Sequence, residues 1–355
     1  MIKTNLALLK ESITHEPSFD GQSARLITLE NANGMTVSFM DIGASWLSTC
    51  LPVKGEQREV LLRSTNMTEH MKQNAYFGSI VGRYANRIAN GQFTLEGHSY
   101  QLDINNGKNS LHGGFQGYDK RRWTIKSQSN NHVMFTLESN DGDQGYPGRV
   151  TVVVTYTLTE QNSVEITYYA ETDKATPLNL TNHAYFNLAG ESSTAKSTDH
   201  TLILNADYYL PTNESLIPTG ELRSVTSTSF DFRQAKSIGR DFLSEPDQEI
   251  AGGYDHAFMF SKEVTDGQQD AAVLISPDKD IVMKVKTTKP AIQFYSGNFL
   301  VDTPGASKEY QRYDGLALET QFLPDGPNHP EWKKNSGILN AGEIYQHQTS
   351  YLFEF

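Results

Sequence analysis

Residues 181–188 (TNHAYFNL) carry the first side chains that could do chemistry. Read as one β-strand, the segment places Thr181, His183, Tyr185 and Asn187 on one face, opposite an apolar face that also carries Asn182. Imidazole is the side chain whose ordinary pKa lies closest to neutral pH, so His183 is a candidate for proton transfer. The spacing leaves open the alternative of a histidine on an ordinary wet strand face.

A second candidate is the carboxylate of residues 316–322 (LALETQF). Strand alternation puts Leu316, Leu318 and Phe322 on one face and Glu319 and Gln321 on the other. A carboxylate in so apolar a strand is costly to bury unless it is paired or used. Glu319 is therefore interpreted as a general base with a tuned pKa, with a glutamate on an exposed edge strand as the alternative.

Three further segments carry polar side chains that could converge on the same site. Gln293 lies on a predicted strand, and residues 82–88 (GRYANRI) bring two arginines and Asn86. His112 is followed by two glycines, which indicates a loop that presents its ring to a cleft, or a turn with an incidental histidine. Asp255 and His256 are neighbours on a strand and point to opposite faces, so only one of them would face a site.

The elements that must position these side chains are predicted to be mainly strands, because most segments alternate with period two and end in turn residues. Two short helices are predicted over residues 66–71 and 234–241. No linker divides the chain, which predicts one domain over residues 1–355: an all-β, large antiparallel sandwich with few short helices. The predicted strands are 93–102, folded at Glu96-Gly97, and 134–139, 151–158, 164–170, 281–287 and 351–355.

Composition excludes several classes of function. The net charge is −12, from 30 basic and 42 acidic residues without a basic cluster, so nucleic acid is a poor partner. No stretch approaches the about 20 apolar residues of a membrane span, and the start resembles no export signal. The single cysteine, Cys50, precludes an intramolecular disulfide and is expected in the core. These features predict a cytoplasmic protein.

The spacing also argues against several kinds of catalytic site. His112, His183 and Glu319 lack the close spacing of zinc motifs, so no metal is expected. No phosphate loop and no Gly-x-Ser-x-Gly elbow occurs, which argues against nucleotide dependence and a serine nucleophile.

The ordered motifs resemble, along most of the chain, those of the aldose 1-epimerase family, the galactose mutarotases. Any one of them would be weak, but their order from residue 33 to residue 328 makes coincidence implausible. They are residues 33–44, 82–88, 109–114, 141–148, 181–188, 217–220, 253–256, 293–298 and 318–328.

This resemblance implies a galactose mutarotase-like sandwich with an open cleft on one concave sheet. It implies interconversion of the α and β anomers of free aldohexoses, such as D-galactose and D-glucose, by ring opening and closure without a cofactor. Glu319 matches the family's general base, His183 its general acid, and His112 a second imidazole that contacts the ring oxygen or a hydroxyl. The positions that match the family's hydroxyl-binding residues are Asn86, Arg87, Asp255 and Gln293.

Opening a hemiacetal moves two protons, one from the anomeric hydroxyl and one to the ring oxygen. For His183 to donate at pH 7 its pKa must be held up, and a nearby carboxylate would do so; His183 is therefore predicted to be protonated at rest. A non-catalytic sugar-binding protein, or a glycoside hydrolase using Asp255 and Glu319, is the alternative. A relative acting on phosphorylated hexoses would need a more basic pocket. The protein is expected to be a monomer or homodimer.

Overall fold

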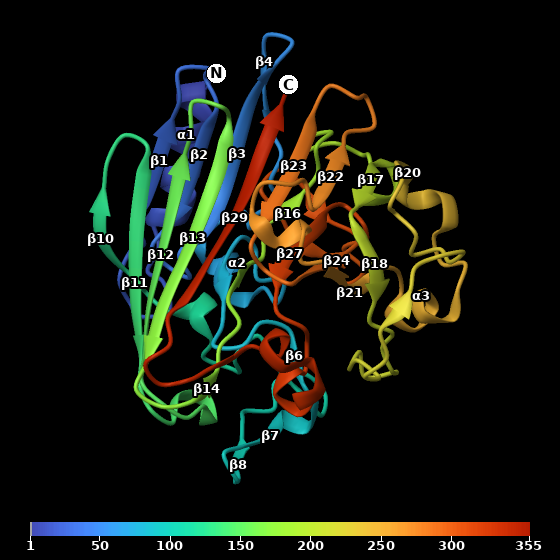
Figure 1. Ribbon diagram of the computed structural model, residues 1–355. Coiled ribbons are helices and arrows are strands. Elements are labelled where there is room, and N and C mark those ends of the chain that lie inside the picture. Colours follow the sequence, from blue (N-terminus) through green and yellow to red (C-terminus); the bar gives the residue numbers. More distant parts are fainter. Residues whose placement is uncertain (1) are drawn as a thin grey trace.

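Two large antiparallel sheets face each other in the computed structural model, which describes residues 2–355 (Figure 1). The larger has nine strands, and the order in space differs from the order in sequence because the C-terminal strand lies at its centre. From edge to edge these strands are β10 (Thr124–Gln128), β11 (His132–Ser139), β12 (Val150–Leu158), β13 (Ser163–Thr172), β29 (Tyr345–Glu354), β23 (Val282–Thr287), β22 (Ala272–Ile275), β17 (Thr201–Leu204) and β20 (Lys236–Ser237).

The second large sheet has six strands and carries part of the candidate site. Its order is β16 (Tyr185–Phe186), β27 (Leu316–Gln321), β24 (Ala291–Tyr295), β21 (Asp255–Phe260), β18 (Ala206–Tyr209) and β19 (Arg223–Ser224). Because β27 lies between β16 and β24, Glu319 is not on an exposed edge strand, which rules out that alternative.

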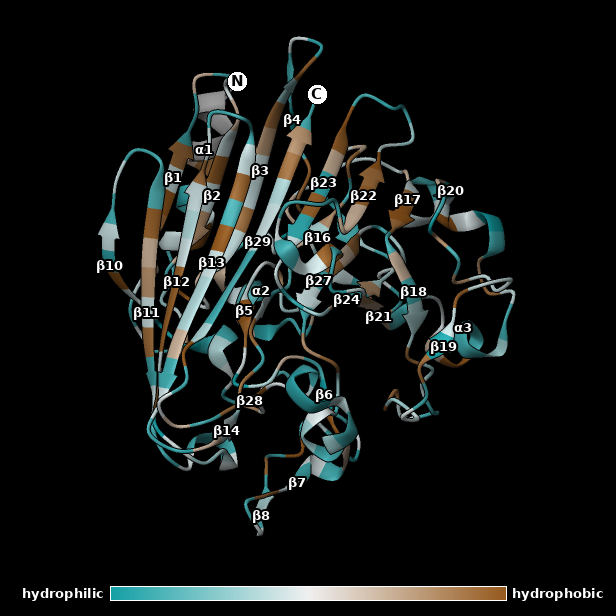
Figure 2. Ribbon diagram, viewed as in Figure 1, coloured by the Kyte–Doolittle hydropathy of each residue, from teal (hydrophilic) through white to brown (hydrophobic). Residues whose placement is uncertain are grey.

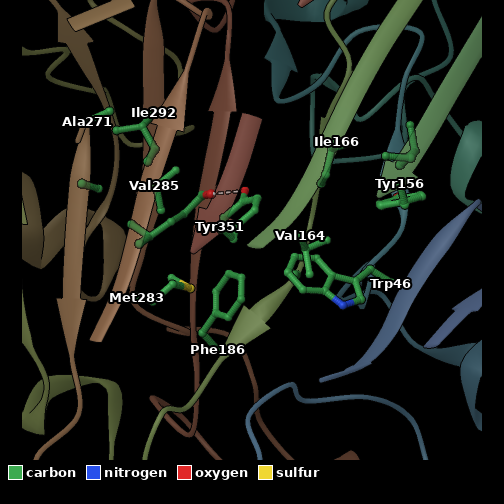
Figure 3. Packing of buried hydrophobic residues seen from close by; sticks show 14 of the residues in the cluster. Trp46, Tyr156, Val164, Ile166, Phe186, Ala271, Met283, Val285, Ile292 and Tyr351 are labelled. Atoms are coloured by element: carbon green, nitrogen blue, oxygen red, sulfur yellow. Dashed lines mark hydrogen bonds between the residues drawn. The ribbon is translucent and has the colours of Figure 1, made fainter. Parts of the chain in front are cut away.

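The main hydrophobic core fills the space between these two sheets. Trp46, Tyr156, Phe186 and Tyr351 pack there with aliphatic residues of the nine-stranded sheet (Figure 3). The hydroxyl of Tyr351 donates a hydrogen bond to the carbonyl oxygen of Leu318 at 3.0 Å, so the core holds β27 directly beneath Glu319. Leu316 and Leu318 face this core, as the alternation in residues 316–322 predicted.

Smaller sheets complete the described part of the chain. One has four strands, β1 (Leu26–Glu30), β2 (Thr36–Met40), β3 (Ser45–Val53) and β4 (Glu56–Glu59), with Cys50 buried in β3 as expected. The two-stranded ones are β5 (Ile80–Val81) with β15 (Thr181–Asn182), β6 (Arg87–Ile88) with β9 (Ser110–Leu111), β7 (Gln92–Leu95) with β8 (His98–Gln101), β14 (Thr176–Pro177) with β28 (Ile338–Leu339), and β25 (Thr303–Pro304) with β26 (Glu309–Tyr310).

The predicted strands are confirmed where the alternation is longest. Figure 2 shows hydrophobic and hydrophilic residues alternating along β11, β12 and β13, whose buried and exposed positions also alternate. The hairpin predicted at Glu96-Gly97 joins β7 to β8. The expected all-β class is therefore confirmed, with each of the two large sheets antiparallel throughout.

The helices match the sequence less well. Asn66 caps α2 (Met67–Lys72) by accepting a hydrogen bond from the Glu69 amide at 2.8 Å, which confirms the helix predicted at 66–71. The α-helix predicted over 234–241 is wrong: Lys236–Ser237 pair with β17, and only a 3₁₀ turn follows. Two helices were not predicted, α1 (Ile2–Thr14) and α3 (Pro246–Ala251). Within residues 2–355 no helix is long and apolar enough to cross a membrane.

Residues 181–188 are not one strand, contrary to the sequence prediction. Thr181–Asn182 pair with β5, and Tyr185–Phe186 pair with β27, so His183 lies in the break between two sheets. The backbone breaks because Asn182, on the apolar side, donates its side-chain amide to the Gly78 carbonyl oxygen at 2.6 Å and accepts from the Ala184 amide. A local side-chain contact thus replaces the strand ladder.

Gly78 fixes the loop that packs against His183. Its φ is 65°, and a Cβ placed there would lie 1.9 Å from the Trp46 carbonyl oxygen. The close approach allows the Gly78 amide to donate to the His183 carbonyl oxygen at 2.9 Å, so a side chain at this position would displace the loop from the histidine.

We expect Gly78→Ala to lower the free energy of unfolding by more than about 3 kcal/mol, because the clash adds to the left-handed backbone. The matched control is Gly97→Ala, which has a φ of 78° but nothing within 4 Å of the added Cβ, and should cost about 1 kcal/mol. Urea unfolding measures both. Equal losses in the two variants would contradict the role given to Gly78.

Candidate functional site

A cleft of about 810 Å³ opens over the face of the six-stranded sheet that points away from the main core. Its wall includes Tyr185 from β16, Glu319 from β27, Tyr295 from β24 and Asp255 at the start of β21. Loops supply the rest of the lining. The volume lies in the range usual for small-molecule sites.

Strand register brings the sheet's polar side chains into two adjacent rows. Glu319 pairs with Gln293, which pairs with Ala257, and the next row holds Ala317, Tyr295 and Asp255. Residues that pair across strands point to the same face, as do residues two apart on one strand. Asp255 therefore faces the cleft, while His256 points away and packs against Phe230, which confirms that only one of these neighbours faces the site.

Glu319 is 2% exposed, and its Oε2 atom has no hydrogen-bond partner within residues 2–355. Burial raises the pKa of its carboxyl group well above the usual value, and the Asp255 carboxylate raises it further, while Arg87 opposes both. The raised pKa is consistent with the tuned carboxyl group expected from the apolar strand, and the role of general base stays a prediction.

His183 lies beside this carboxyl group, with Nε2 3.6 Å from Oε1 of Glu319. Burial lowers the pKa of the imidazole to about 4, so the ring is neutral at pH 7. The prediction that His183 is protonated at rest is wrong. Desolvation by burial is the dominant cause, because it disfavours the charged imidazole.

His112 is held by a two-residue ladder that joins two motifs of the sequence. Arg87 pairs with Leu111 between β6 and β9. Beside this pair, the His112 amide donates a hydrogen bond to the Asn86 carbonyl oxygen, which holds Asn86 against His112. Gly113 lies close to the backbone of another loop, because a Cβ added at this position would be 2.0 Å from the Gly82 carbonyl oxygen. The glycines after His112 thus bring two loops together and leave the ring facing the cleft.

The tautomer of His112 follows from its hydrogen bond. Nδ1 accepts the Asn86 amide hydrogen at 3.1 Å, so the proton of the neutral ring is on Nε2. Burial lowers the pKa of this imidazole well below its usual value, and His183 and Arg87 lower it further. His112 therefore offers one N–H donor at neutral pH.

The four side chains matched to hydroxyl binding form a connected group. Asp255 accepts a hydrogen bond from Gln293 at 2.7 Å through Oδ1 and lies 3.7 Å from Nη1 of Arg87 through Oδ2. The Nε of Arg87 donates to Asn106 at 3.1 Å. Asn86, Arg87 and Asp255 line the cleft, whereas Gln293 lies behind Asp255 and is outside the lining.

The sequence misjudged some neighbours of His183. Of the residues predicted on its face, Tyr185 lines the cleft, while Asn187 binds the carbonyl oxygens of Ala195 and Asp314 elsewhere. Tyr76 was missed: its ring lines the cleft, 4.6 Å from the ring of His112. The only signal was an aromatic residue shortly before the motif at 82–88.

His112, His183 and Glu319 each place a possible ligand atom within 4.8 Å of the others. Their spacing in the sequence is therefore no argument against a metal, because the fold brings them together. The tautomer of His112 is an argument, since Nδ1 is engaged by Asn86 and Nε2 carries a proton. That leaves one imidazole and one carboxyl group, fewer than the three protein ligands of a catalytic zinc.

Comparisons with known proteins show which family the chain resembles along most of its length. A model of the family described as aldose 1-epimerase matches residues 25–352. An aldose 1-epimerase of Haemophilus influenzae is 49% identical over 348 residues, covering 98% of this chain and 100% of that protein. A galactose mutarotase of Sus scrofa is 42% identical over 311 residues, covering 86% and 87%.

The chain belongs to the aldose 1-epimerase family. The solved structure of a galactose 1-epimerase from Lactobacillus acidophilus is 31% identical, with a TM-score of 0.83 over 96% of this chain and 97% of that one. The resemblance seen in the motifs and the expected enzyme, an epimerase of the isomerase class, are confirmed. The glycoside hydrolase and non-catalytic alternatives are not favoured.

Because His112 is a donor, we expect epimerase activity to be unchanged after dialysis against EDTA. We also expect protein that is dialysed after the addition of Zn²⁺ to retain no stoichiometric zinc, as measured by elemental analysis. One tightly held zinc per chain, with activity lost on its removal, would contradict the tautomer assigned to His112.

Proposed function

We propose that this epimerase interconverts the α and β anomers of free aldohexoses, D-galactose and D-glucose among them, through the open-chain aldehyde. The observation that carries the proposal is the pair formed by Glu319 and His183, two proton-transfer groups 3.6 Å apart and buried in one cleft. Two such groups on one sugar are what opening a hemiacetal ring requires.

In ring opening, Glu319 takes the proton of the anomeric hydroxyl O1, and His183 gives a proton to the ring oxygen O5 as the C1–O5 bond breaks. The aldehyde then rotates about C1–C2 and presents its other face. On closure O5 attacks C1, His183 takes back the O5 proton, and Glu319 returns a proton to O1. Both groups end in their starting states, so no cofactor enters the balance.

The pair needs one proton between its two members. In the sugar-free enzyme burial favours this proton on Glu319, because it raises the pKa of the carboxyl group and lowers that of His183 to about 4. Ring opening starts from the other arrangement of this single proton, in which His183 carries it and Glu319 is ionised. Substrate hydroxyls that donate hydrogen bonds to Glu319 favour its charged form and thereby this arrangement.

The other polar residues hold the sugar while C1 moves. The Nε2–H group of His112 donates to the ring oxygen or a neighbouring hydroxyl, because its tautomer is fixed by Asn86. Arg87 and Asp255 bind hydroxyl groups through charged hydrogen bonds, the stronger kind. Gln293 orients Asp255 from behind and reaches the sugar only through that carboxylate.

A free rather than phosphorylated sugar fits the charges of the cleft, because its lining holds five acidic residues and three basic ones. Of the basic residues, Arg87 is already engaged by Asp255 and Asn106. We further propose a cytoplasmic enzyme, monomeric or homodimeric, without nucleic acid as a partner. The single cysteine supports the reducing compartment, and the net charge of −12 argues against nucleic acid as a partner.

We expect Glu319→Gln to lower kcat at least about 100-fold, because the amide keeps the shape of the side chain but removes the base. Polarimetry of freshly dissolved α-D-galactose and α-D-glucose measures the decay of rotation. The matched control is Glu191→Gln, a buried carboxylate outside the cleft whose accepted hydrogen bonds an amide oxygen can keep. Full activity in Glu319→Gln, or none in the wild type, would reject the proposal.

The dependence of kcat/KM on pH should be bell-shaped. Activity should fall below about pH 4, because His183 is then protonated as well as Glu319 and the pair holds two protons. It should fall again at high pH, because Glu319 then loses its proton and the pair holds none. Asp255→Asn removes a charge that raises the pKa of Glu319, so the high-pH limb should move to lower pH. A limb that stays in place or moves to higher pH would contradict this electrostatic account.

A further inference from the structure

His183 lacks the hydrogen bond that usually orients a catalytic imidazole. Its Nδ1 atom is buried, and no partner for it lies within residues 2–355. A ring whose second nitrogen is bonded to a carboxylate or carbonyl has a fixed orientation, as in the serine protease triad. Some other contact must therefore hold the ring of His183.

The rings of two tyrosines stack on His183. The Tyr185 ring lies 5.0 Å from it and the Tyr76 ring 5.9 Å, centroid to centroid, each inclined by 25°. Offset stacking at such distances is a favourable and directional aromatic contact. Tyr185 belongs to β16, the strand beside β27, so its position follows from the sheet.

Tyr76 differs because it contacts both imidazoles of the cleft. Its ring is 4.6 Å from that of His112, at an angle of 59°, and the two imidazoles are 5.3 Å apart at 76°. Tyr76, His112 and His183 thus form a closed triangle of rings. Rotation of either imidazole out of its present plane would change its contact with the tyrosine ring.

The backbone fixes Tyr76 in relation to His183. Tyr76 has a φ of 58°, in the left-handed region that residues other than glycine rarely adopt. Its carbonyl oxygen accepts from the Ser79 amide at 3.0 Å, and the Ser79 carbonyl oxygen accepts from the His183 amide at 2.9 Å. One loop therefore positions the tyrosine and the backbone of the histidine together.

We propose that Tyr76 is a positioning residue for the epimerase reaction: its ring, rather than its hydroxyl group, holds the imidazoles of His112 and His183 at the mutual orientation in which both point at the ring-oxygen end of the sugar. This inference rests on the proposed role of His183 as the proton donor. A misplacement of about 1 Å in such a group is enough to cost about 100-fold in rate.

The test compares Tyr76→Phe, which keeps the ring, with Tyr76→Leu, which removes it. Polarimetry with α-D-galactose should give a kcat for Tyr76→Phe within about twofold of wild type, and a kcat for Tyr76→Leu at least about tenfold lower, with KM changed less than about threefold. Tyr208→Leu makes the same change on the exposed side of β18, outside the cleft, and should retain wild-type kinetics.

Three kinetic results would overturn the proposal. A wild-type kcat in Tyr76→Leu would show that the ring positions nothing. A loss that falls on KM alone would make Tyr76 a sugar-binding platform. An equal loss in Tyr76→Phe would assign the effect to the hydroxyl group.

A spectroscopic test does not depend on activity and so separates this inference from the proposed function. In the wild type, nuclear Overhauser effects should connect the Tyr76 ring protons to the ring protons of both His112 and His183. In Tyr76→Leu both imidazole C–H resonances should move downfield as the ring current is lost, and in Tyr76→Phe they should stay. If Tyr76→Leu does not fold, the wild-type cross-peaks still decide, because their absence overturns the proposal.

Discussion

Keeping the carboxyl group of Glu319 away from water, without a cation in direct contact, is the constraint on which the site depends. An ionised carboxylate in such surroundings is costly, so burial raises the pKa of Glu319 well above its usual value and favours the protonated form. The burial is produced by the fold: β27 lies between β16 and β24, the main core packs on its far side, and His183 covers the near side. The same burial keeps His183 neutral.

The charges around this pair nearly balance each other. Asp255 raises the pKa of Glu319 and Arg87 lowers it, while Arg87 and Asp255 lie 3.7 Å apart. The two groups proposed to bind the sugar are therefore also groups that shift the pKa of Glu319, the proposed base. A sugar that engages Arg87 and Asp255 changes the field at Glu319, so binding and proton transfer are coupled through residues that need not move.

Much of the fold could be read from the sequence because β11, β12 and β13 alternate over eight to ten residues. Glu319, His183 and His112 could be singled out because charged or titratable groups stood in apolar strands or beside glycines. The break at His183 could not be predicted, since it depends on Asn182 reaching Gly78, about 100 residues away. The neutral state of His183 and the contact with Tyr76 are likewise products of packing between distant segments.

The central claim is that the buried pair carries one proton, and that in the sugar-free enzyme this proton resides on Glu319. The carboxyl carbon of Glu319, labelled with ¹³C and assigned by its loss in Glu319→Gln, reports this directly in an NMR titration. The account predicts the chemical shift of a protonated carboxylic acid well above the usual range of a glutamate, together with a neutral His183. An ionised Glu319 beside a charged imidazole at neutral pH in the sugar-free enzyme would contradict it.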